Sequence, residues 1–307
     1  MSDIQQALLA GVNLNRQHHF EVEMEELKNL AMACEVKVMG QVTQNLTQIN
    51  QRHYMGLGKL EEILEQLTIT GANIVIFNDE LSPAQIRNLE EILECKVIDR
   101  TMLILDIFSQ RARTREAQLQ VEIAALQYML PRLIGLRQSL GRQVGGVGTK
   151  NRGVGEKKLE LDRRRIEDRI SFLRNELKDL TAHRQTQRKK RMKSGMPSVA
   201  LVGYTNAGKS TLMNCLLKTF GETGDKQVLE KDMLFATLET AVRRISLPEN
   251  QTFLLTDTVG FVSKLPHHLI KAFRSTLEEV KEADLLIHVV DFSNPDYHEQ
   301  IQVTNQT

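Results

Sequence analysis

The chain has 307 residues, of which 41% are hydrophobic and 26% are charged, values that are ordinary for soluble proteins and sufficient for two or three domains. No apolar run approaches the ~18 residues of a membrane-spanning helix, and no basic segment precedes the short apolar patch near the N-terminus, so we expect neither membrane insertion nor a signal peptide. Three widely spaced cysteines, Cys34, Cys95 and Cys215, argue against a disulfide framework or a zinc site and predict a reduced, cytoplasmic setting.

The net charge of +1 conceals three blocks of alternating sign. Residues 1–105 carry 8 Lys/Arg against 15 Asp/Glu, residues 106–195 carry 22 against 10, and residues 196–307 carry 10 against 14. A basic block between two acidic blocks is typical of an element that binds a polyanion, most often nucleic acid. A solvated helix that binds nothing is the alternative, but such a helix would mix its signs more evenly.

The first block, residues 1–105, alternates helical and strand-like patterns. The expected helices cover residues 23–34, 60–67 and 84–93, and the expected strands cover residues 36–40, 74–77 and 97–99. Ser82 is a good N-cap for the last of these helices, with Pro83 at its first position. Strands that alternate with helices predict a small parallel α/β domain.

The second block, residues 106–195, predicts two facing helices. Leucine and isoleucine recur at spacings of three and four residues, first from Leu119 to Leu133 and again from Ile166 to Leu180. Two such stripes predict an antiparallel helical hairpin. Because proline disrupts a helix interior, we expect a kink or a restart at Pro131.

The tip of this hairpin, residues 141–155, contains six glycines and three basic side chains, Arg142, Lys150 and Arg152. Glycine backbone can approach phosphate groups closely, and the basic residues add electrostatic attraction. We therefore expect these three residues to bind structured RNA through its shape and its phosphates. A flexible linker is the alternative, but linkers rarely carry this charge at the end of a stiff arm.

The third block, residues 196–307, opens with an apolar run, the pattern Gly-x-x-x-x-Gly-Lys-Ser and then a helical stretch. Strand, glycine-rich turn and helix N-terminus form a P-loop, which directs backbone N–H groups and a helix dipole at a phosphate chain. Lys209 would reach the β- and γ-phosphates, and the Ser210 hydroxyl would bind Mg²⁺. A glycine turn that binds nothing is the alternative, and the flanking elements argue against it. The residues expected to bind nucleotide here are Gly203, Tyr204, Thr205, Asn206, Ala207, Gly208, Lys209, Ser210 and Thr211.

A second motif, Asp-x-x-Gly, ends an apolar strand 47 residues after Ser210, at Asp257. Asp257 would contact Mg²⁺, and the Gly260 N–H would meet the γ-phosphate. Between the two motifs, Thr237 is the candidate switch threonine that completes the Mg²⁺ shell. The segment expected to bind nucleotide is Asp257, Thr258, Val259 and Gly260; the expected Mg²⁺ ligands are Ser210, Thr237 and Asp257, and the expected catalytic residues are Lys209, Thr237 and Gly260.

Two features depart from an ordinary GTPase domain. Phe261 follows Gly260, where Ras-like GTPases commonly keep a glutamine that orients water, so we expect hydrolysis to be slow or to depend on a group supplied from elsewhere. The sequence also lacks Asn-Lys-x-Asp, the motif that reads guanine. We expect either that the GTPase domain is C-terminally incomplete or that base recognition is lost.

The motifs together resemble those of the HflX family of ribosome-associated GTPases, over nearly the whole chain. The segments that carry the resemblance are Tyr54–Glu62, Asp79–Gln85, Val97–Thr101, Ile107–Ala112, Gly153–Glu160, Gly203–Ser210, Leu234–Leu238 and Asp257–Phe261. The resemblance implies an α/β multidomain protein with three parts: a small parallel α/β N-terminal domain over residues 1–105, an antiparallel helical hairpin over 106–195 and a P-loop GTPase domain over 196–307.

The same resemblance implies GTP and Mg²⁺ as ligands and the large ribosomal subunit and its rRNA as partners, with stalled ribosomes split or rescued under stress. We expect the chain to be a monomer. Two alternatives remain: an RNA- or ribosome-binding fragment without competent turnover, and an ATP-dependent RNA remodeller that uses the N-terminal domain.

Overall fold

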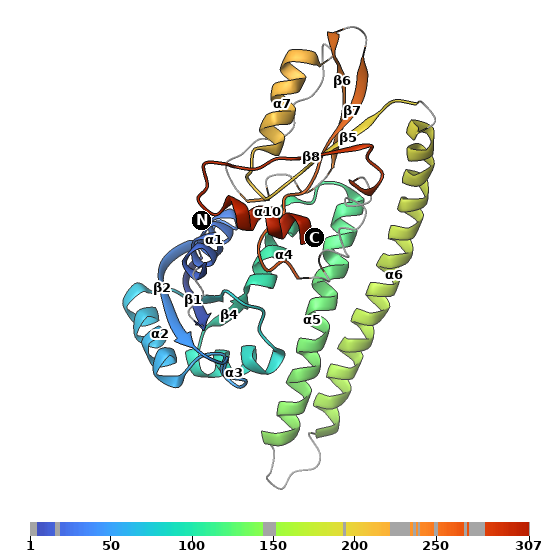
Figure 1. Ribbon diagram of the computed structural model, residues 1–307. Helices are drawn as coiled ribbons and strands as arrows, with labels where there is room; N and C mark the ends of the chain where they lie inside the picture. Colours follow the sequence, from blue (N-terminus) through green and yellow to red (C-terminus); the bar gives the residue numbers. More distant parts are fainter. Residues whose placement is uncertain are drawn as a thin grey trace. The chain divides into compact units, whose positions relative to one another are not determined.

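A computed structural model, shown in Figure 1, describes residues 5–15, 19–143, 152–192, 195–221, 234–235, 238, 240–248, 251–266, 269 and 280–306. Its contacts divide the chain into two compact units. The first comprises Met1–Ile107 and Ala125–Leu173, and the second comprises Phe108–Ala124 and Arg174–Thr307. No helix within the described ranges is both long and apolar enough to cross a membrane.

The first sheet is wholly parallel, as the sequence predicted, with the strand order β2-β1-β3-β4. Its strands are β1 (Gln6–Leu14), β2 (Lys37–Leu46), β3 (Ile74–Phe77) and β4 (Lys96–Asp99). Strand β1, which we did not predict, lies at the centre and pairs with both β2 and β3. Because the strand is buried on both faces, its sequence is a continuous apolar run without the alternation that marks a half-exposed strand.

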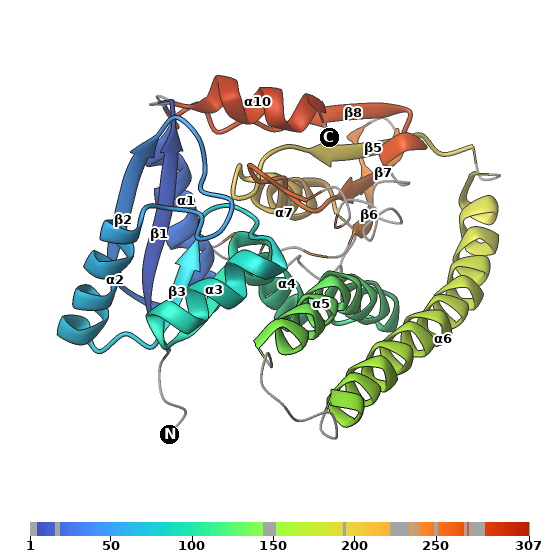
Figure 2. The same ribbon diagram turned by 90° about the horizontal axis from the view of Figure 1, so that it is seen from below.

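Helices cover both faces of this sheet (Figure 2). They are α1 (Phe20–Ala33), α2 (Leu57–Thr70), α3 (Pro83–Leu93) and α4 (Arg100–Arg111). Alternate residues of β1 face opposite ways: Leu8 packs in one core with Leu60 of α2, whereas a Cβ on Gly11 would lie 2.5 Å from the sulfur of Met24 in α1. Helix α3 begins as predicted, with Ser82 in a capping box.

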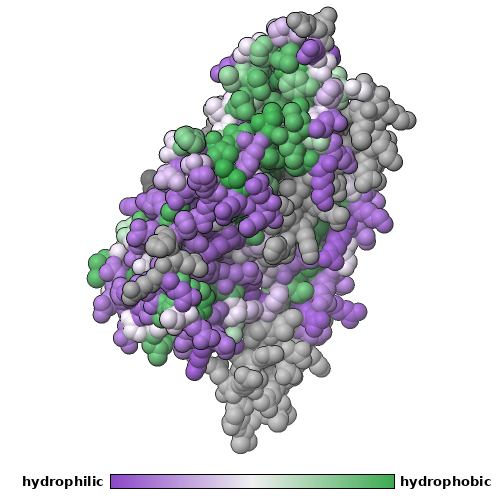
Figure 3. All heavy atoms as spheres, in the orientation of Figure 1, coloured by the Kyte–Doolittle hydropathy of each residue, from purple (hydrophilic) through white to green (hydrophobic). Residues whose placement is uncertain are grey.

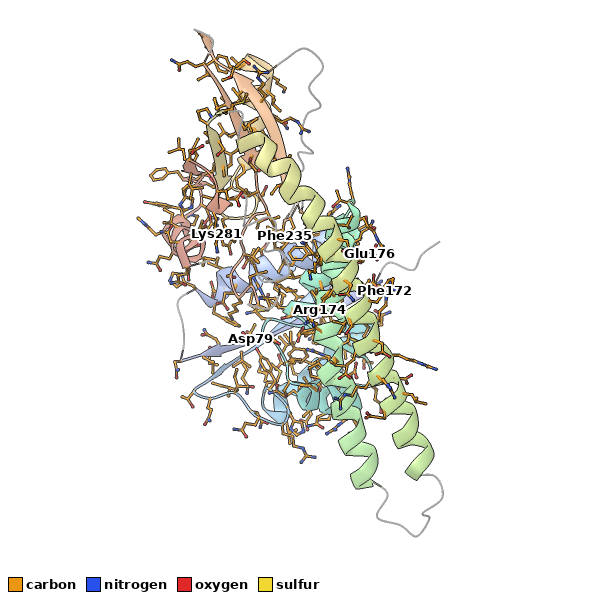
Figure 4. All side chains as sticks on the ribbon, turned by 90° about the vertical axis from the view of Figure 1, so that its right-hand side faces the viewer. Asp79, Phe172, Arg174, Glu176, Phe235 and Lys281 are labelled. Carbon is orange, nitrogen blue, oxygen red and sulfur yellow. The ribbon has the colours of Figure 1, made fainter. Side chains whose placement is uncertain are left out.

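The predicted hairpin is present as α5 (Arg115–Gln143) and α6 (Arg152–Met192), consecutive helices that run antiparallel. Near the start of α5 the guanidinium of Arg115 donates to both carboxylate oxygens of Glu176 in α6, at 2.7 and 2.8 Å (Glu176 is labelled in Figure 4). Helix α5 runs on through Pro131, so the restart that we considered there does not occur. At 1.5 Å per residue, the 41 residues of α6 extend about 60 Å.

The second sheet has the order β6-β7-β5-β8, with β6 antiparallel to β7 and the other pairs parallel. Its strands are β5 (Ser198–Val202), β6 (Ala241–Ser246), β7 (Thr252–Asp257) and β8 (Leu285–His288), and the helices of this part are α7 (Lys209–Phe220) and α10 (Tyr297–Gln306). Strand β8 has the apolar sequence of a buried strand, yet Leu285 and Leu286 are about half exposed. Figure 3 shows hydrophobic residues gathered on the surface of this part of the chain.

Candidate nucleotide-binding site

The predicted P-loop lies between the carboxyl end of β5 and the first residue of α7. Gly208 caps α7 with φ +90°, a left-handed conformation that suits glycine. At the other end of the loop, Gly203 has φ +150°, and a Cβ there would lie 2.3 Å from the carbonyl oxygen of Val289. The two glycines therefore let the backbone turn tightly into the helix N-terminus, where the N–H groups of the first turn have no intrahelical acceptor and favour an anion.

Lys209 is held within the loop that it follows. Its ammonium donates to the carbonyl oxygen of Gly203 at 3.1 Å and to that of Tyr204 at 2.6 Å. The side chain is only 6% exposed, and this burial lowers the pKa of Lys209 to about 8, although Asp257 acts in the opposite direction. A cation fixed over a glycine-rich turn is positioned to neutralise a phosphate chain that lies along the same turn.

Ser210 and Asp257 come from different elements and meet at the edge of the second sheet. The parallel register pairs Leu201 with Asp257, which brings the carboxyl ends of β5 and β7 together. As a result the Ser210 hydroxyl donates to a carboxylate oxygen of Asp257 at 2.7 Å. Two converging oxygen ligands, one of them anionic, fit the preference of Mg²⁺, so these residues suit the predicted metal.

The segment after β7 pairs with the P-loop backbone. The Thr205 N–H donates to the carbonyl oxygen of Phe261 at 2.7 Å, and the Phe261 N–H donates to the carbonyl oxygen of Gly203 at 3.2 Å. Gly260 can lie this close to the P-loop because it lacks a Cβ, which would lie 2.5 Å from the Thr205 Cα. Two residues before Gly260, the Thr258 hydroxyl donates to the carbonyl oxygen of Leu201 at 2.6 Å. The structure thus brings the predicted Asp-x-x-Gly segment against the P-loop.

Sequence reasoning missed Phe235, which joins the P-loop to helix α4. Its backbone N–H donates to the hydroxyl of Thr205 at 2.9 Å. Its ring, 1% exposed, packs edge-to-face on Phe108 of α4 with the ring centroids 4.7 Å apart and the planes at 81°. In the sequence it belonged to the segment Leu234–Leu238, but no role was assigned to it there; Thr237, two residues later, lies outside the described residues.

Two of the three predicted RNA-binding residues lie in helix ends, where the sequence had predicted a loop over residues 141–155. Arg142 lies in the last turn of α5, and Arg152 is the first residue of α6. Lys150 lies outside the described residues.

A buried polar cluster, also missed by sequence reasoning, holds α5 against the first sheet. The carboxylate of Asp99, at the end of β4, is fully buried and accepts hydrogen bonds from Arg132 at 3.1 Å and from the hydroxyl of Tyr128. It also accepts from the backbone N–H groups of Leu81 at 3.0 Å and Met102 at 2.9 Å. The guanidinium of Arg132 lies 3.3 Å above the Tyr128 ring. The segment of α5 that carries Tyr128 and Arg132 is therefore fixed to the parallel sheet.

Three family models match successive ranges of the chain. Residues 21–109 match the family described as GTP-binding GTPase N-terminal, and residues 111–191 match GTP-binding GTPase Middle Region. Residues 198–307 match the family described as 50S ribosome-binding GTPase, and they contain the P-loop and the Asp-x-x-Gly segment.

Similar proteins cover the chain almost completely. It is 49% identical to a protein called GTPase HflX from Lacrimispora saccharolytica, over 99% of this chain and 70% of that protein. It is 52% identical to GTPase HflX of Caldanaerobacter subterraneus subsp. tengcongensis, over 93% of this chain and 65% of that one. A solved structure, a GTP-binding protein from Sulfolobus solfataricus in complex with GDP, is 25% identical with a TM-score of 0.50, over 98% of this chain and 75% of that one. The chain thus spans about two thirds of the length of the two HflX relatives.

Proposed function

Because the chain belongs to the HflX family of GTPases, we propose that it binds and hydrolyses GTP and that its helical hairpin binds the large ribosomal subunit, so that stalled ribosomes are split or rescued under stress. The observation that carries the proposal is the convergence of Lys209, Ser210 and Asp257 on one glycine-rich turn. The solved relative was crystallised with GDP, which supports a guanine nucleotide as the ligand.

Each residue at the site has a distinct task in this proposal. The glycine-rich turn Gly203–Thr211 holds the phosphate chain through the backbone N–H groups at the start of α7, and the Lys209 ammonium neutralises it. The Thr205 N–H is not among these groups, because it donates to the carbonyl oxygen of Phe261. Ser210, Asp257 and Thr237 hold Mg²⁺, which supplies charge neutralisation on the phosphate oxygens when bound. The Gly260 N–H donates to the terminal phosphate.

Phe261 limits what the site does alone. Its side chain has no hydrogen-bonding group, and its backbone N–H and carbonyl are both engaged with the P-loop. It therefore cannot orient a water molecule as a glutamine would. We propose that hydrolysis is slow until a group from a partner or from the substrate orients that water.

The hairpin is the part proposed to touch RNA. Residues 106–195 carry 22 basic against 10 acidic side chains. Arg142 lies near the C-terminus of α5, and Arg152 is the first residue of α6. Together with Lys150 they would contact rRNA phosphates. We further propose that the chain functions as three domains, residues 1–105, 106–195 and 196–307, and the three matched family ranges support this division.

Sedimentation with purified ribosomal subunits tests the proposal. The chain is expected to sediment with the large subunit, and more strongly with a non-hydrolysable GTP analogue than with GDP. Lys209→Ala should abolish the difference between the two nucleotides, whereas Lys218→Ala, an exposed lysine on the same helix, should preserve it. Equal sedimentation of the wild type in all nucleotide states would refute nucleotide control, and sedimentation with neither subunit would refute the ribosomal partner.

A further inference from the structure

Tyr204 lies in the P-loop, between β5 and α7 (Figure 1), yet its side chain contacts a different segment. Its hydroxyl accepts a hydrogen bond from the backbone N–H of Ser263 at 2.7 Å. Its carbonyl oxygen accepts from the Lys209 ammonium at 2.6 Å. Tyr204 therefore contacts the phosphate-binding lysine through its backbone and the segment after β7 through its side chain.

The bond between Tyr204 and Ser263 extends a contact that the backbone begins. The Thr205 N–H donates to the carbonyl oxygen of Phe261 at 2.7 Å, and the Phe261 N–H donates to that of Gly203 at 3.2 Å. The Tyr204 hydroxyl binds two residues further along the same segment. Of these three bonds, only the one to Tyr204 depends on a side chain, so it is the one that substitution can remove without changing the backbone.

Gly260 immediately precedes the segment that Tyr204 holds. A Cβ on Gly260 would lie 2.5 Å from the Thr205 Cα, so its backbone lies directly against the P-loop. In the proposed function the Gly260 N–H donates to the terminal phosphate. Because consecutive Cα atoms are only about 3.8 Å apart, holding the residues that follow Gly260 restricts where this donor can move. Restricting a donor before binding reduces the entropy that is lost when the ligand binds.

We propose that Tyr204 is a positioning residue: its hydroxyl, bound to the Ser263 N–H, holds the segment after β7 so that the Gly260 N–H is placed for the terminal phosphate of a nucleoside triphosphate. This inference rests on the proposed function and adds to it a side chain that sets how well the site distinguishes a triphosphate from a diphosphate. The P-loop pattern accepts any residue at this position, so the pattern itself gives the tyrosine side chain no task.

Tyr204→Phe tests the inference, because it removes the hydroxyl and keeps the ring and the backbone. Tyr297→Phe, on α10, is the matched control and makes the same chemical change elsewhere in the same part of the chain. For each protein we would measure, without ribosomes, the affinities for a non-hydrolysable GTP analogue and for GDP, both with Mg²⁺, and the melting temperature. Hydrogen exchange of the Ser263 and Phe261 amides, measured by NMR, reports on the segment itself.

Tyr204→Phe is expected to weaken binding of the analogue by about two- to tenfold, the size of one hydrogen bond, and to change GDP affinity less than about twofold. The Ser263 amide should exchange faster in this variant, whereas the Phe261 amide, bound to a backbone carbonyl, should change less. Tyr297→Phe should change neither affinity. A hydroxyl that only stabilises the fold would lower the melting temperature and weaken both nucleotides alike.

A measurement on the wild type needs no variant. If the Tyr204–Ser263 bond favours the triphosphate, the triphosphate must favour that bond to the same extent. The Ser263 amide should therefore be better protected with the analogue bound than with GDP bound.

Three results would overturn the inference: equal weakening of both nucleotides by Tyr204→Phe, unchanged or tighter binding of the analogue, and equal protection of the Ser263 amide in the two nucleotide states. In each case the proposed function would stand, because the wild type still binds GTP. A wild-type chain that bound no guanine nucleotide would instead refute the proposed function, and this inference with it.

Discussion

Replacing Asp99 by asparagine tests whether the buried cluster fixes the hairpin arm to the parallel sheet. The substitution keeps the shape of the side chain but removes its charge and turns one acceptor oxygen into a donor. Four donors then face an uncharged amide: the Arg132 guanidinium, the Tyr128 hydroxyl and the N–H groups of Leu81 and Met102. Burial, followed by the nearby Asp99 charge, raises the pKa of Tyr128, so that residue stays a neutral donor.

Removing one partner of a buried ion pair costs about 3–5 kcal/mol, because the other charge is left uncompensated. Arg132 is still 16% exposed, which allows some solvation, so we expect the free energy of unfolding to fall by about 3 kcal/mol. Urea denaturation measures the loss, and hydrogen exchange of the α5 amides near Tyr128 should rise with it. Asp168→Asn, on the exposed face of α6, is the matched control and should change stability by less than about 0.5 kcal/mol.

A double-mutant cycle separates the cluster from general packing. Tyr128→Phe removes one donor to Asp99 and leaves the ring, so its effect should be largely absent in the Asp99→Asn background. A loss below about 1 kcal/mol for Asp99→Asn, or additive effects of the two substitutions, would contradict the view that Asp99 holds the arm.

Three further predictions follow from the site and the hairpin. Since burial lowers the pKa of Lys209 to about 8 and phosphate binds the charged ammonium, GDP affinity should be flat near neutral pH and fall as the pH rises through 8 toward 10.5; a fluorescence titration series measures this. Gly260→Ala, whose Cβ would lie 2.5 Å from the Thr205 Cα, should lower stability by about 1–3 kcal/mol and weaken nucleotide binding, as measured by thermal melting and titration. Binding to the large subunit should weaken at least tenfold between about 50 and 200 mM salt in sedimentation assays, because the hairpin is basic.

The phosphate-binding half of the site was predictable because its determinants are local. Gly203, Gly208 and Lys209 lie within seven residues, and the strand and helix on either side have ordinary sequence patterns. Asp257 was predictable for a different reason: parallel strands bring their carboxyl ends to one edge, so a polar residue there falls near the P-loop. Strand, turn and helix patterns sufficed in both cases.

The contacts that join distant segments were not predictable in this way. Asp99 meets Tyr128 across 29 residues and Arg132 across 33, and Phe235 meets Phe108 across more than a hundred. Nothing in a single sequence distinguishes an aspartate at a strand end that accepts four hydrogen bonds from one that faces solvent. Strand β1 was missed because its Ala and Gly residues are weak strand formers and only its neighbours make it central.

The Gly203 carbonyl links the segment after β7 to the phosphate site. It accepts from the Lys209 ammonium and also from the Phe261 N–H, so one peptide group serves both the P-loop and the segment that carries Gly260. Because Gly203 has no Cβ, the carbonyl oxygen of Val289, one residue beyond β8, can also approach Gly203 closely. We therefore expect a displacement of Phe261 to disturb one of the two carbonyl oxygens that hold the Lys209 ammonium. The Lys209 ammonium and the segment that carries Gly260 are thus joined through the Gly203 carbonyl oxygen.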